Sequence, residues 1–222
     1  MRELTRADFE GLRAHALREP NRCKPDLLLY EVDGEQVVLK DYSGKAGVLR
    51  EVVGPVLIGR EARALRALRG IEGVPQFRGR PDRHCVAMSY VAGRRVAKRV
   101  FRLADNTDFF RVLADIVRQM HARGVVHLDL KHRSNLMVRE DGWPAIIDFE
   151  SALCFGPRRL LGRLAVAVLG QVDLLALENW KRRLCPGALS RRGRRRARLA
   201  RRLRGWWVPR RFLTAFRDIF VR

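Results

Sequence analysis

Three polar side chains in the middle of the chain, and a fourth shortly after them, could do chemistry together. The stretch VVHLDLKHRSNLMV, residues 125–138, carries Asp129, Lys131 and Asn135, and the following run IIDFE carries Asp148. A carboxylate beside a hydroxyl can act as a general base, and carboxylate and amide oxygens are ligands that Mg²⁺ accepts. The two apolar runs around the loop suggest paired strands, but a two-residue turn would join such a pair. The longer, charged loop therefore predicts a reactive site.

A lysine and a glutamate earlier in the chain complete the set of reactive groups. Lys40 ends the apolar run VVLK, and Glu61 falls on the apolar face of the next predicted helix. A buried acid requires a partner, and Lys40 is available. Phosphoryl transfer from ATP needs a lysine on the phosphates, an acid that fixes it, a base and oxygen ligands for a metal. The order Lys40, Glu61, Asp129, Asn135, Asp148 offers a candidate for each part.

These motifs resemble those of the protein-kinase-like superfamily. VVLK is similar to the kinase pattern V-A-I-K, HLDLK to H-R-D-L and DFE to D-F-G. The small size resembles that of bacterial lipopolysaccharide-core kinases, which phosphorylate heptose or Kdo sugars, and secondarily that of compact RIO-type protein kinases. The resemblance covers residues 37–150.

The resemblance implies an α+β, two-lobed protein-kinase-like fold and the cofactors ATP and Mg²⁺. We expect a small β-rich N-lobe at residues 1–91 and a mainly helical C-lobe at residues 92–222. In AMSYVAG, the hinge between the lobes, Met88 would lie at the gate of the nucleotide site, and the backbone from Ser89 to Val91 would face adenine.

The same resemblance assigns roles to the polar residues. Lys40 would bind the nucleotide phosphates and Glu61 would fix that lysine, Asp129 would be the catalytic base and Lys131 would steady the transferring phosphate. Asn135 and Asp148 would hold the metal. His127 is expected to be structural. Asp173, an acid within an apolar helix, could anchor the backbone of the catalytic loop or could face solvent.

Four features depart from the kinase pattern. No G-x-G-x-x-G precedes Lys40, so another loop must cover the phosphates, and REPNRCKP at residues 18–25 is a candidate. The spacing from the base to the amide is one residue longer than in the signature, which puts Ser134 at the nominal position; we expect Asn135, and not Ser134, to face the metal. D-F-G is D-F-E, so Glu150 adds a carboxylate near the metal. No A-P-E follows, and the segment after Glu150 is too short for a regulatory activation loop.

The elements that must position these residues can be read from the apolar patterns. They are a hairpin that turns at Asp33-Gly34, a helix between Pro55 and Gly70, a strand in HCVAMSYV, a helix from Asn106 or Thr107 to Gly124, and a turn REDG before the strand AIIDFE. From about Pro157, apolar helical segments alternate with arginine clusters.

Composition bounds the protein class. The chain has 222 residues, of which 47% are hydrophobic and 32% charged, as in a globular protein. The formal net charge of +22 attracts polyanions. Its four cysteines form no C-x-x-C pair, which favours reduced thiols. No signal peptide is apparent, and because LLGRLAVAVLGQVDLLAL is interrupted by polar residues, we expect no transmembrane helix.

The C-terminal region carries the densest positive charge. Residues 181–222 contain sixteen Lys and Arg and one acid, and Trp206 shares a predicted helical face with Leu199 and Leu203. Arginine opposite aromatic residues is typical of an interfacial helix. We expect a cytoplasmic protein, peripheral on the inner membrane, although these faces could instead pack on the larger lobe.

Several functions remain open at this stage. The favoured one is ATP- and Mg²⁺-dependent transfer of phosphate to a hydroxyl of a lipopolysaccharide or other anionic glycolipid sugar. A serine/threonine protein kinase of compact RIO-like type is the first alternative. A pseudokinase, which would serve as a binding or scaffold module, is the second. A nucleic-acid binder is disfavoured because no reading motif accompanies the arginines. The oligomeric state is left open.

Overall fold

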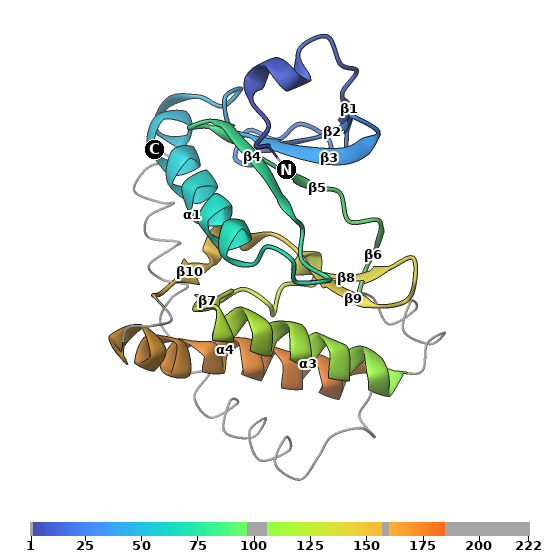
Figure 1. Ribbon diagram of the computed structural model, residues 1–222, viewed down its shortest axis with the longest axis vertical. Helices are drawn as coiled ribbons and strands as arrows, with labels where there is room; N and C mark the ends of the chain where they lie inside the picture. Colours follow the sequence, from blue (N-terminus) through green and yellow to red (C-terminus); the bar gives the residue numbers. More distant parts are fainter. Residues whose placement is uncertain (1, 97–105, 157–159, 185–222) are drawn as a thin grey trace.

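A five-stranded antiparallel sheet and one helix form one end of the molecule (Figure 1). The computed structural model describes residues 2–96, 106–156 and 160–184. The strands follow the order β1-β2-β3-β5-β4, with helix α1 beside them. Their bounds are β1 His15–Ala16, β2 Asp26–Val32, β3 Glu35–Asp41, β4 Phe77–Asp82, β5 Cys85–Ser89 and α1 Gly54–Ala67. A 3-10 turn, Arg6–Phe9, precedes the sheet, and a π-helical turn, Leu49–Val53, leads into α1.

The predicted hairpin between β2 and β3 turns where the sequence indicates. Asp33 and Gly34 both have positive φ angles, 51° and 78°. Two consecutive left-handed residues are the requirement of a type I′ turn, which matches the twist of the flanking strands. The resulting register pairs Lys40 with Leu27 on one side and with Val86 on the other. Lys40 is therefore held on the central strand of the sheet.

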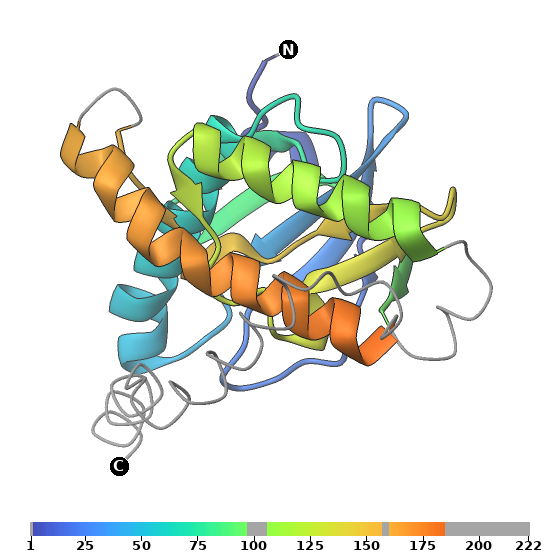
Figure 2. The same ribbon diagram turned by 90° about the horizontal axis from the view of Figure 1, so that it is seen from below.

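The other end of the molecule is built from two small sheets and two long helices. Figure 2 shows helices α3 and α4 lying together at this end. Sheet β6-β8-β9 contains three strands, and β7 pairs with β10. The bounds are β6 Gly93–Arg95, α3 Asn106–Ala122, β7 Val125–Val126, β8 Leu136–Arg139, β9 Pro144–Ile146, β10 Leu153–Cys154 and α4 Leu160–Leu184, with 3-10 turns at Arg133–Asn135 and Phe149–Ser151.

The strands on either side of the polar loop do not pair with each other. The sequence suggested such a pair, but β7 pairs with β10, and β8 lies between β6 and β9. Strand β7 contains only two residues, so the chain between β7 and β8 is not confined to a hairpin turn. The conformation of the polar loop is therefore set by its own side chains and by contacts with α4, and not by pairing of β7 with β8.

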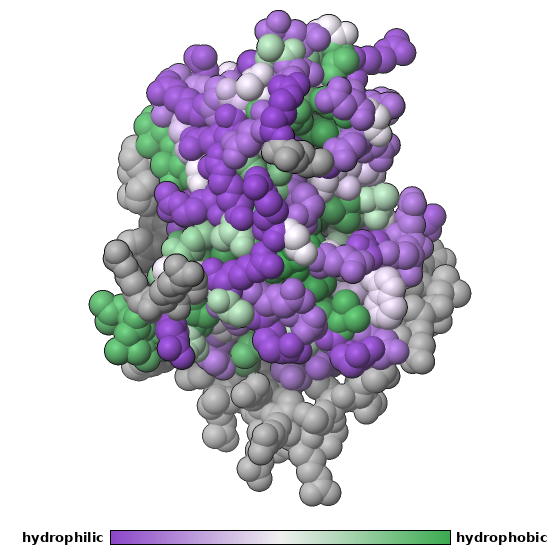
Figure 3. All heavy atoms as spheres, viewed as in Figure 1, coloured by the Kyte–Doolittle hydropathy of each residue, from purple (hydrophilic) through white to green (hydrophobic). Residues whose placement is uncertain are grey.

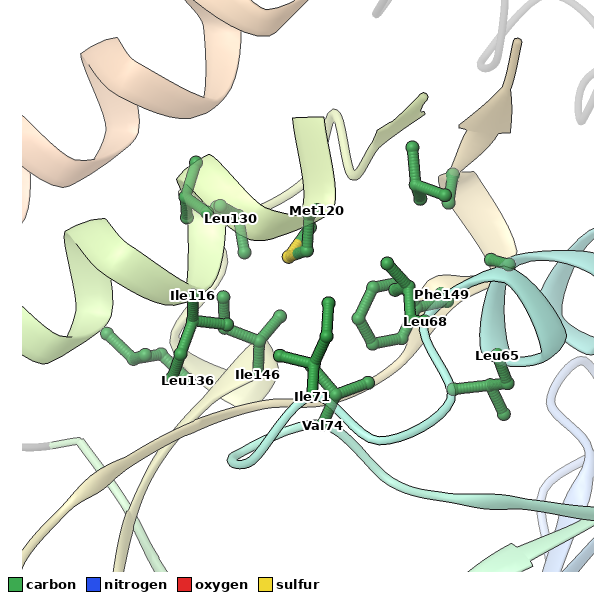
Figure 4. Packing of buried hydrophobic residues seen from close by; sticks show 14 of the residues in the cluster. Leu65, Leu68, Ile71, Val74, Ile116, Met120, Leu130, Leu136, Ile146 and Phe149 are labelled. Atoms are coloured by element: carbon green, nitrogen blue, oxygen red, sulfur yellow. The ribbon is translucent and has the colours of Figure 1, made fainter. Parts of the chain in front are cut away.

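One hydrophobic core joins the two ends. Side chains from α1, the following loop, α3, β9 and the Phe149 turn meet in it (Figure 4). The loop approaches β9 closely at Gly73, whose φ is +79° and whose carbonyl accepts the Ile146 N–H at 2.8 Å. A Cβ at Gly73 would lie 2.7 Å from both Ile116 Cδ1 and the Pro144 carbonyl oxygen. Glycine is therefore needed where the first half of the chain packs on the second.

The expected fold class is confirmed, because a β-rich first part is followed by a part with two long helices. The apolar face predicted for α3 is buried: Phe109, Leu113, Ile116, Val117 and Met120 are at most 3% exposed. A lobe boundary at residue 91 stays a prediction. The predicted C-terminal helices, with Leu199, Leu203 and Trp206, lie outside the described residues.

Candidate active site

Lys40 is the centre of a buried cluster of charges. Its ammonium nitrogen lies 2.8 Å from Glu61 Oε2, 2.8 Å from Asp148 Oδ1 and 3.0 Å from Glu150 Oε1. The Lys40 and Glu61 side chains are 7% and 1% exposed, whereas the Asp148 side chain is 43% exposed. The structure therefore brings together three residues that the sequence predicted to act together, and Asp148 opens the cluster to solvent.

The charges in this cluster shift one another's pKa values. Burial disfavours the Lys40 ammonium, but Glu61, Asp148 and Glu150 outweigh it and raise the pKa of Lys40 well above its usual value. Burial also opposes ionisation of Asp148, yet the Lys40 charge holds the pKa of Asp148 below its usual value. Burial raises the pKa of Glu61, and Lys40 opposes that rise. Lys40 is thus firmly protonated and Asp148 ionised, as phosphate and metal binding require.

Helix α1 and the Phe149 turn place the two acids. The apolar face of α1 is buried against the core, and Glu61 lies on that face. Glu61 Oε1 accepts the Phe149 N–H at 3.0 Å, so the glutamate ties α1 to the turn as well as to Lys40. Asp148 has φ 67° and ψ 75°, a left-handed conformation that is uncommon for a residue with a Cβ. At Asp148 the chain therefore turns away from the direction of β9, and the carboxylate points toward Lys40.

The catalytic loop is tied to the strand that carries Asp148. His127 is fully buried, and its Nε2 lies 3.2 Å from the Ile147 carbonyl oxygen, to which it can donate. The Asp129 N–H donates to His127 Nδ1 at 3.3 Å, and the Ile147 N–H donates to the Asn135 carbonyl oxygen at 3.0 Å. His127 is therefore structural, as expected, and these bonds hold Asp129 next to the Asp148 segment.

Asn135, and not Ser134, faces Asp129. The Asn135 side chain is buried, and its Nδ2 donates to Asp129 Oδ2 and to the Asp129 carbonyl oxygen, both at 3.1 Å. The Ser134 hydroxyl donates to Asn135 Oδ1 at 2.7 Å. The 3-10 turn Arg133–Asn135 thus accommodates the additional residue of the loop. Asn135 Oδ1, the atom that could bind a metal, is engaged by Ser134 in this structure.

Helix α4 holds the loop from below. Asp173 has no exposed surface, and its carboxylate accepts the N–H groups of His127 at 2.9 Å and Leu128 at 2.8 Å. Trp180 Nε1 donates to the Leu130 carbonyl oxygen at 2.8 Å. Of the two roles that the sequence left open for Asp173, the structure shows the anchor.

Comparisons with known proteins agree with this geometry. The RIO domain family matches residues 41–156, which is more than half of the chain. The chain belongs to the RIO domain family. This family is protein-kinase-like, so the kinase-like resemblance seen in the motifs is confirmed.

Two curated proteins are similar in sequence to part of this chain. A probable SapB synthase of Streptomyces coelicolor is 34% identical in an alignment of 140 residues, which covers 54% of this chain and 15% of that protein. CBL-interacting protein kinase 25 of Oryza sativa subsp. japonica is 31% identical in an alignment of 183 residues, which covers 77% of this chain and 35% of that protein. The chain spans well under half the length of either relative.

A kinase-like family implies that ATP and a divalent metal bind. The carboxylates around Lys40 fit the metal. The carboxylate oxygens of Glu61, Asp148 and Glu150 lie within 4.8 Å of one another. Carboxylate oxygens are the ligands that Mg²⁺ prefers. Asp148 is the most exposed of the three side chains, followed by Glu150, so these two carboxylates would be the more accessible ligands for a metal.

The remaining predicted residues are placed less directly. Lys131 is exposed on the catalytic loop and is not part of the Lys40 cluster. Met88 is buried at the end of β5, while Ser89 and Val91 are half-buried. The Ser89 N–H donates to the Gln76 carbonyl oxygen at 2.9 Å, so this amide is used within the protein. The hinge also lines a pocket of about 500 Å³ that does not include Lys40 or Asp148.

The loop predicted to cover the phosphates ends directly before β2, the strand whose Leu27 pairs with Lys40. Residues 18–25 connect β1 to β2. They are exposed except for Arg18, which is half-buried, and Pro25, which is buried. The Arg18 guanidinium donates to the Pro25 carbonyl oxygen and so closes the base of the loop. Arg22 and Lys24 are exposed on it. Its role in binding phosphate stays a prediction.

Tyr42 and Trp180 are site residues that sequence reasoning missed. The Tyr42 hydroxyl donates to Glu150 Oε1 at 3.0 Å, and burial together with Glu150 raises the pKa of Tyr42. Tyr42 lies two residues after Lys40 and directly after the end of β3, and in extended chain this spacing places two side chains on the same side. This spacing was a signal that could have placed Tyr42 with Lys40. For Trp180 the sequence held no comparable signal, because its partner Leu130 lies far away along the chain.

Proposed function

We propose that this RIO domain chain transfers the γ-phosphate of ATP to a hydroxyl group with the help of a divalent metal. The observation that carries the proposal is the Lys40 cluster. In it the Lys40 ammonium lies 2.8 Å from a carboxylate oxygen of Glu61, the acid that fixes it, and 2.8 Å from one of Asp148, which is exposed. Phosphoryl transfer depends on positioning and on charge stabilisation, and these groups supply both.

The residues of the chain would divide the work as follows. Lys40 binds phosphate oxygens, and Asp148, joined by Asn135, holds the metal, which when bound neutralises charge on the transferring phosphate. Asp129, fixed by Asn135 and by His127, accepts the proton of the acceptor hydroxyl. Lys131 is exposed two residues after Asp129 and would steady the transferring phosphate.

The adenine ring would bind beside the hinge. Met88 is buried behind it, and because the Ser89 N–H is used by Gln76, the expected contacts with adenine fall to the Val91 N–H and the hinge carbonyl groups. Ser89 would then contribute its carbonyl oxygen alone. A nucleotide placed there would extend its phosphates toward Lys40 on the neighbouring strand.

We propose a sugar hydroxyl of an anionic glycolipid, such as lipopolysaccharide, as the acceptor. The net charge of +22 and an exposed apolar face on α4 both suit a substrate in an anionic membrane. A serine or threonine hydroxyl of a protein is the second candidate, because a relative 31% identical to this chain is named a protein kinase. The two candidates share the same chemistry and differ in the acceptor alone.

The apolar face of α4 supports docking on an anionic membrane. Leu160, Leu161, Leu164 and Val168 are between 54% and 80% exposed, and Figure 3 shows hydrophobic surface where α4 begins. Helix α4 is long and apolar enough to span a membrane by length and composition. Its second half, however, holds the catalytic loop through Asp173 and Trp180. We therefore propose that α4 lies on the membrane surface and does not cross it.

The test separates nucleotide binding from turnover. Wild type, Lys40→Met, Asp148→Ala and Asp129→Asn would be incubated with labelled ATP, Mg²⁺ and either membrane glycolipid or total protein, and nucleotide affinity would be measured in parallel. We expect Lys40→Met and Asp148→Ala to lose nucleotide affinity. Asp129→Asn should retain it and lose about 10²-fold or more in turnover.

Each outcome of this test has a defined meaning. Label in the glycolipid fraction supports the sugar acceptor, and label in protein alone supports the second candidate. If wild type binds ATP tightly while it and Asp129→Asn are equally inert with both fractions, the chain is a pseudokinase. Normal turnover by Lys40→Met and Asp148→Ala would refute the assignment of the site.

A further inference from the structure

Glu150 contacts Lys40 in the place where a nucleotide phosphate is expected. Its Oε1 lies 3.0 Å from Lys40 Nζ and accepts the Tyr42 hydroxyl at 3.0 Å. The Glu150 side chain is 19% exposed, so it is held in the cluster and does not project into solvent. The kinase pattern D-F-G has glycine at this position, so this carboxylate is a departure from that pattern.

Three carboxylates surround the Lys40 ammonium, which donates hydrogen bonds to Glu61 and Asp148 and forms an ion pair with Glu150. An ammonium group has three N–H donors, and Lys40 faces one oxygen each of Glu61, Asp148 and Glu150 at 2.8–3.0 Å. A phosphate oxygen can therefore bind Lys40 only if one of the three carboxylates leaves. Which one leaves decides how nucleotide enters the site.

Glu61 is the least able of the three to leave. It is 1% exposed, and its second oxygen is held by the Phe149 N–H at 3.0 Å. Loss of the Lys40 contact would leave a charge buried in the core, which is costly. The choice thus falls on Asp148 and Glu150, which lie toward the open side of the cluster.

The charge of the cluster favours a cation as the new partner of these two carboxylates. Three carboxylates face a single ammonium, so the cluster has excess negative charge, and it repels a nucleotide that carries no metal. A divalent cation would offset that excess. The carboxylate oxygens of Glu61, Asp148 and Glu150 lie within 4.8 Å of one another, so one ion can contact more than one of them without a large movement of the backbone.

We propose that Glu150 is a ligand of the divalent metal together with Asp148, that this pair binds the cation before nucleotide arrives, and that Glu150 exchanges Lys40 for the cation. The exchange frees one Lys40 N–H for a phosphate oxygen. No covalent bond changes in this step. The proposal rests on the proposed function for the identity of the nucleotide, but the metal site itself can be tested without turnover.

The first experiment measures Mn²⁺ binding to nucleotide-free protein from the electron paramagnetic resonance signal of free Mn²⁺. Wild type is expected to bind one Mn²⁺, and Glu150→Gln should weaken its affinity by about tenfold or more, as loss of a metal-supporting group does. Asp148→Asn should weaken it at least as much. Glu140→Gln, a surface substitution on the β8–β9 turn, should leave the affinity unchanged.

A second arm measures ATP binding in the presence of a chelator. Glu150→Gln should bind metal-free ATP more tightly than wild type, because the amide carries no charge and competes weakly for Lys40. Tyr42→Phe removes the hydroxyl that donates to Glu150 and leaves the carboxylate in place, so Mn²⁺ affinity should be kept or increased. Glu150→Gln preserves side-chain volume and relieves repulsion, and thermal unfolding will show that the variant is folded.

Three results would overturn the proposal. The first is nucleotide-free wild type that binds no Mn²⁺, and the second is equal Mn²⁺ affinity in wild type and Glu150→Gln. The third is a loss of Mn²⁺ affinity in Tyr42→Phe that is as large as the loss in Glu150→Gln, which would assign the effect to packing. Because no acceptor or turnover is involved, an inactive protein whose Mn²⁺ affinity still depends on Glu150 would refute the proposed function and leave this inference standing.

Discussion

Asp173 accepts the backbone N–H of His127 at 2.9 Å from a side chain that has no exposed surface. The same carboxylate accepts the Leu128 N–H, and Leu128 has a positive φ of 67°. A left-handed leucine is strained, so the surrounding contacts must hold it in place. Asp173 supplies two of these contacts, and it thereby fixes the backbone directly before Asp129.

Asp173→Ala is predicted to reduce both stability and turnover. Two backbone N–H groups would lose their acceptor in a buried site, which should lower the free energy of unfolding by about 2–4 kcal/mol. Turnover should fall while nucleotide affinity is retained, because the loop carries Asp129 and not Lys40. Urea unfolding and kinetics would measure these effects. Asp115→Ala, which removes a half-exposed acid of α3, is the matched control and should change neither quantity; equal effects of the two substitutions would contradict the anchor role.

Lys40→Met is predicted to make stability fall as pH rises. Burial raises the pKa of Glu61 and Lys40 opposes that rise, so removal of Lys40 raises the pKa further. Between the ordinary glutamate value of 4.5 and the raised value, the folded variant keeps a proton that the unfolded chain has released. Folding then binds protons, and stability decreases with pH by about 1.4 kcal/mol per unit of pKa difference.

The double variant Lys40→Met/Glu61→Gln isolates the cause of that pH dependence. A glutamine at position 61 does not titrate, so the additional slope should disappear. Thermal and urea unfolding at about pH 5 and about pH 8 would compare wild type with the two variants. If the single and the double variant had the same slope, another group would be responsible.

Asn135→Ala is predicted to impair catalysis far more than Ser134→Ala does. Asn135 holds the Asp129 carboxylate and is the expected amide ligand of the metal, whereas Ser134 contacts only the Asn135 side chain and His132 within the described residues. We expect Asn135→Ala to reduce turnover by about 10–100-fold and to raise the Mg²⁺ concentration needed for half-maximal activity. Titration of Mg²⁺ against rate measures both. The reverse ranking of the two variants would show that Ser134 occupies the metal position.

Much of the candidate site could be predicted because its signals are local. The turn Asp33-Gly34 fixes the strand that carries Lys40, and the apolar face of α1 directs Glu61 inward. Asp148 follows a short buried strand, which places it at a strand end. In each case a period of the sequence or a turn residue determines which way a single side chain points, and no distant partner is needed.

The rest depends on contacts between distant segments, and the sequence carries no local signal for them. Strand β7 pairs with β10 and not with β8, although β8 is the nearer of the two along the chain. Trp180 supports the loop from the far end of α4, and because this helix has both buried and exposed apolar side chains, its sequence does not indicate which side packs on the loop. Glu150 was expected near the metal, but its contact with Lys40 arises from the turn that follows Asp148. Such pairings become visible only when the chain is folded.

The exposed leucines of α4 are predicted to contribute to membrane binding. Leu161, Leu164 and Val168 are 80%, 54% and 69% exposed and recur at helical spacing on one face of α4. An anionic surface would attract the net charge of +22, and insertion of each apolar side chain would add about 1 kcal/mol or more. The triple substitution to Gln should therefore lower the fraction that pellets with phosphatidylglycerol vesicles. Leu12→Gln, at an exposed leucine elsewhere, should not. Replacement of Trp206 and Trp207 by Ala tests the C-terminal segment in the same assay. Since the α4 side chains are exposed, thermal unfolding should be unchanged, and unaltered pelleting of the folded triple variant would show that α4 does not bind lipid.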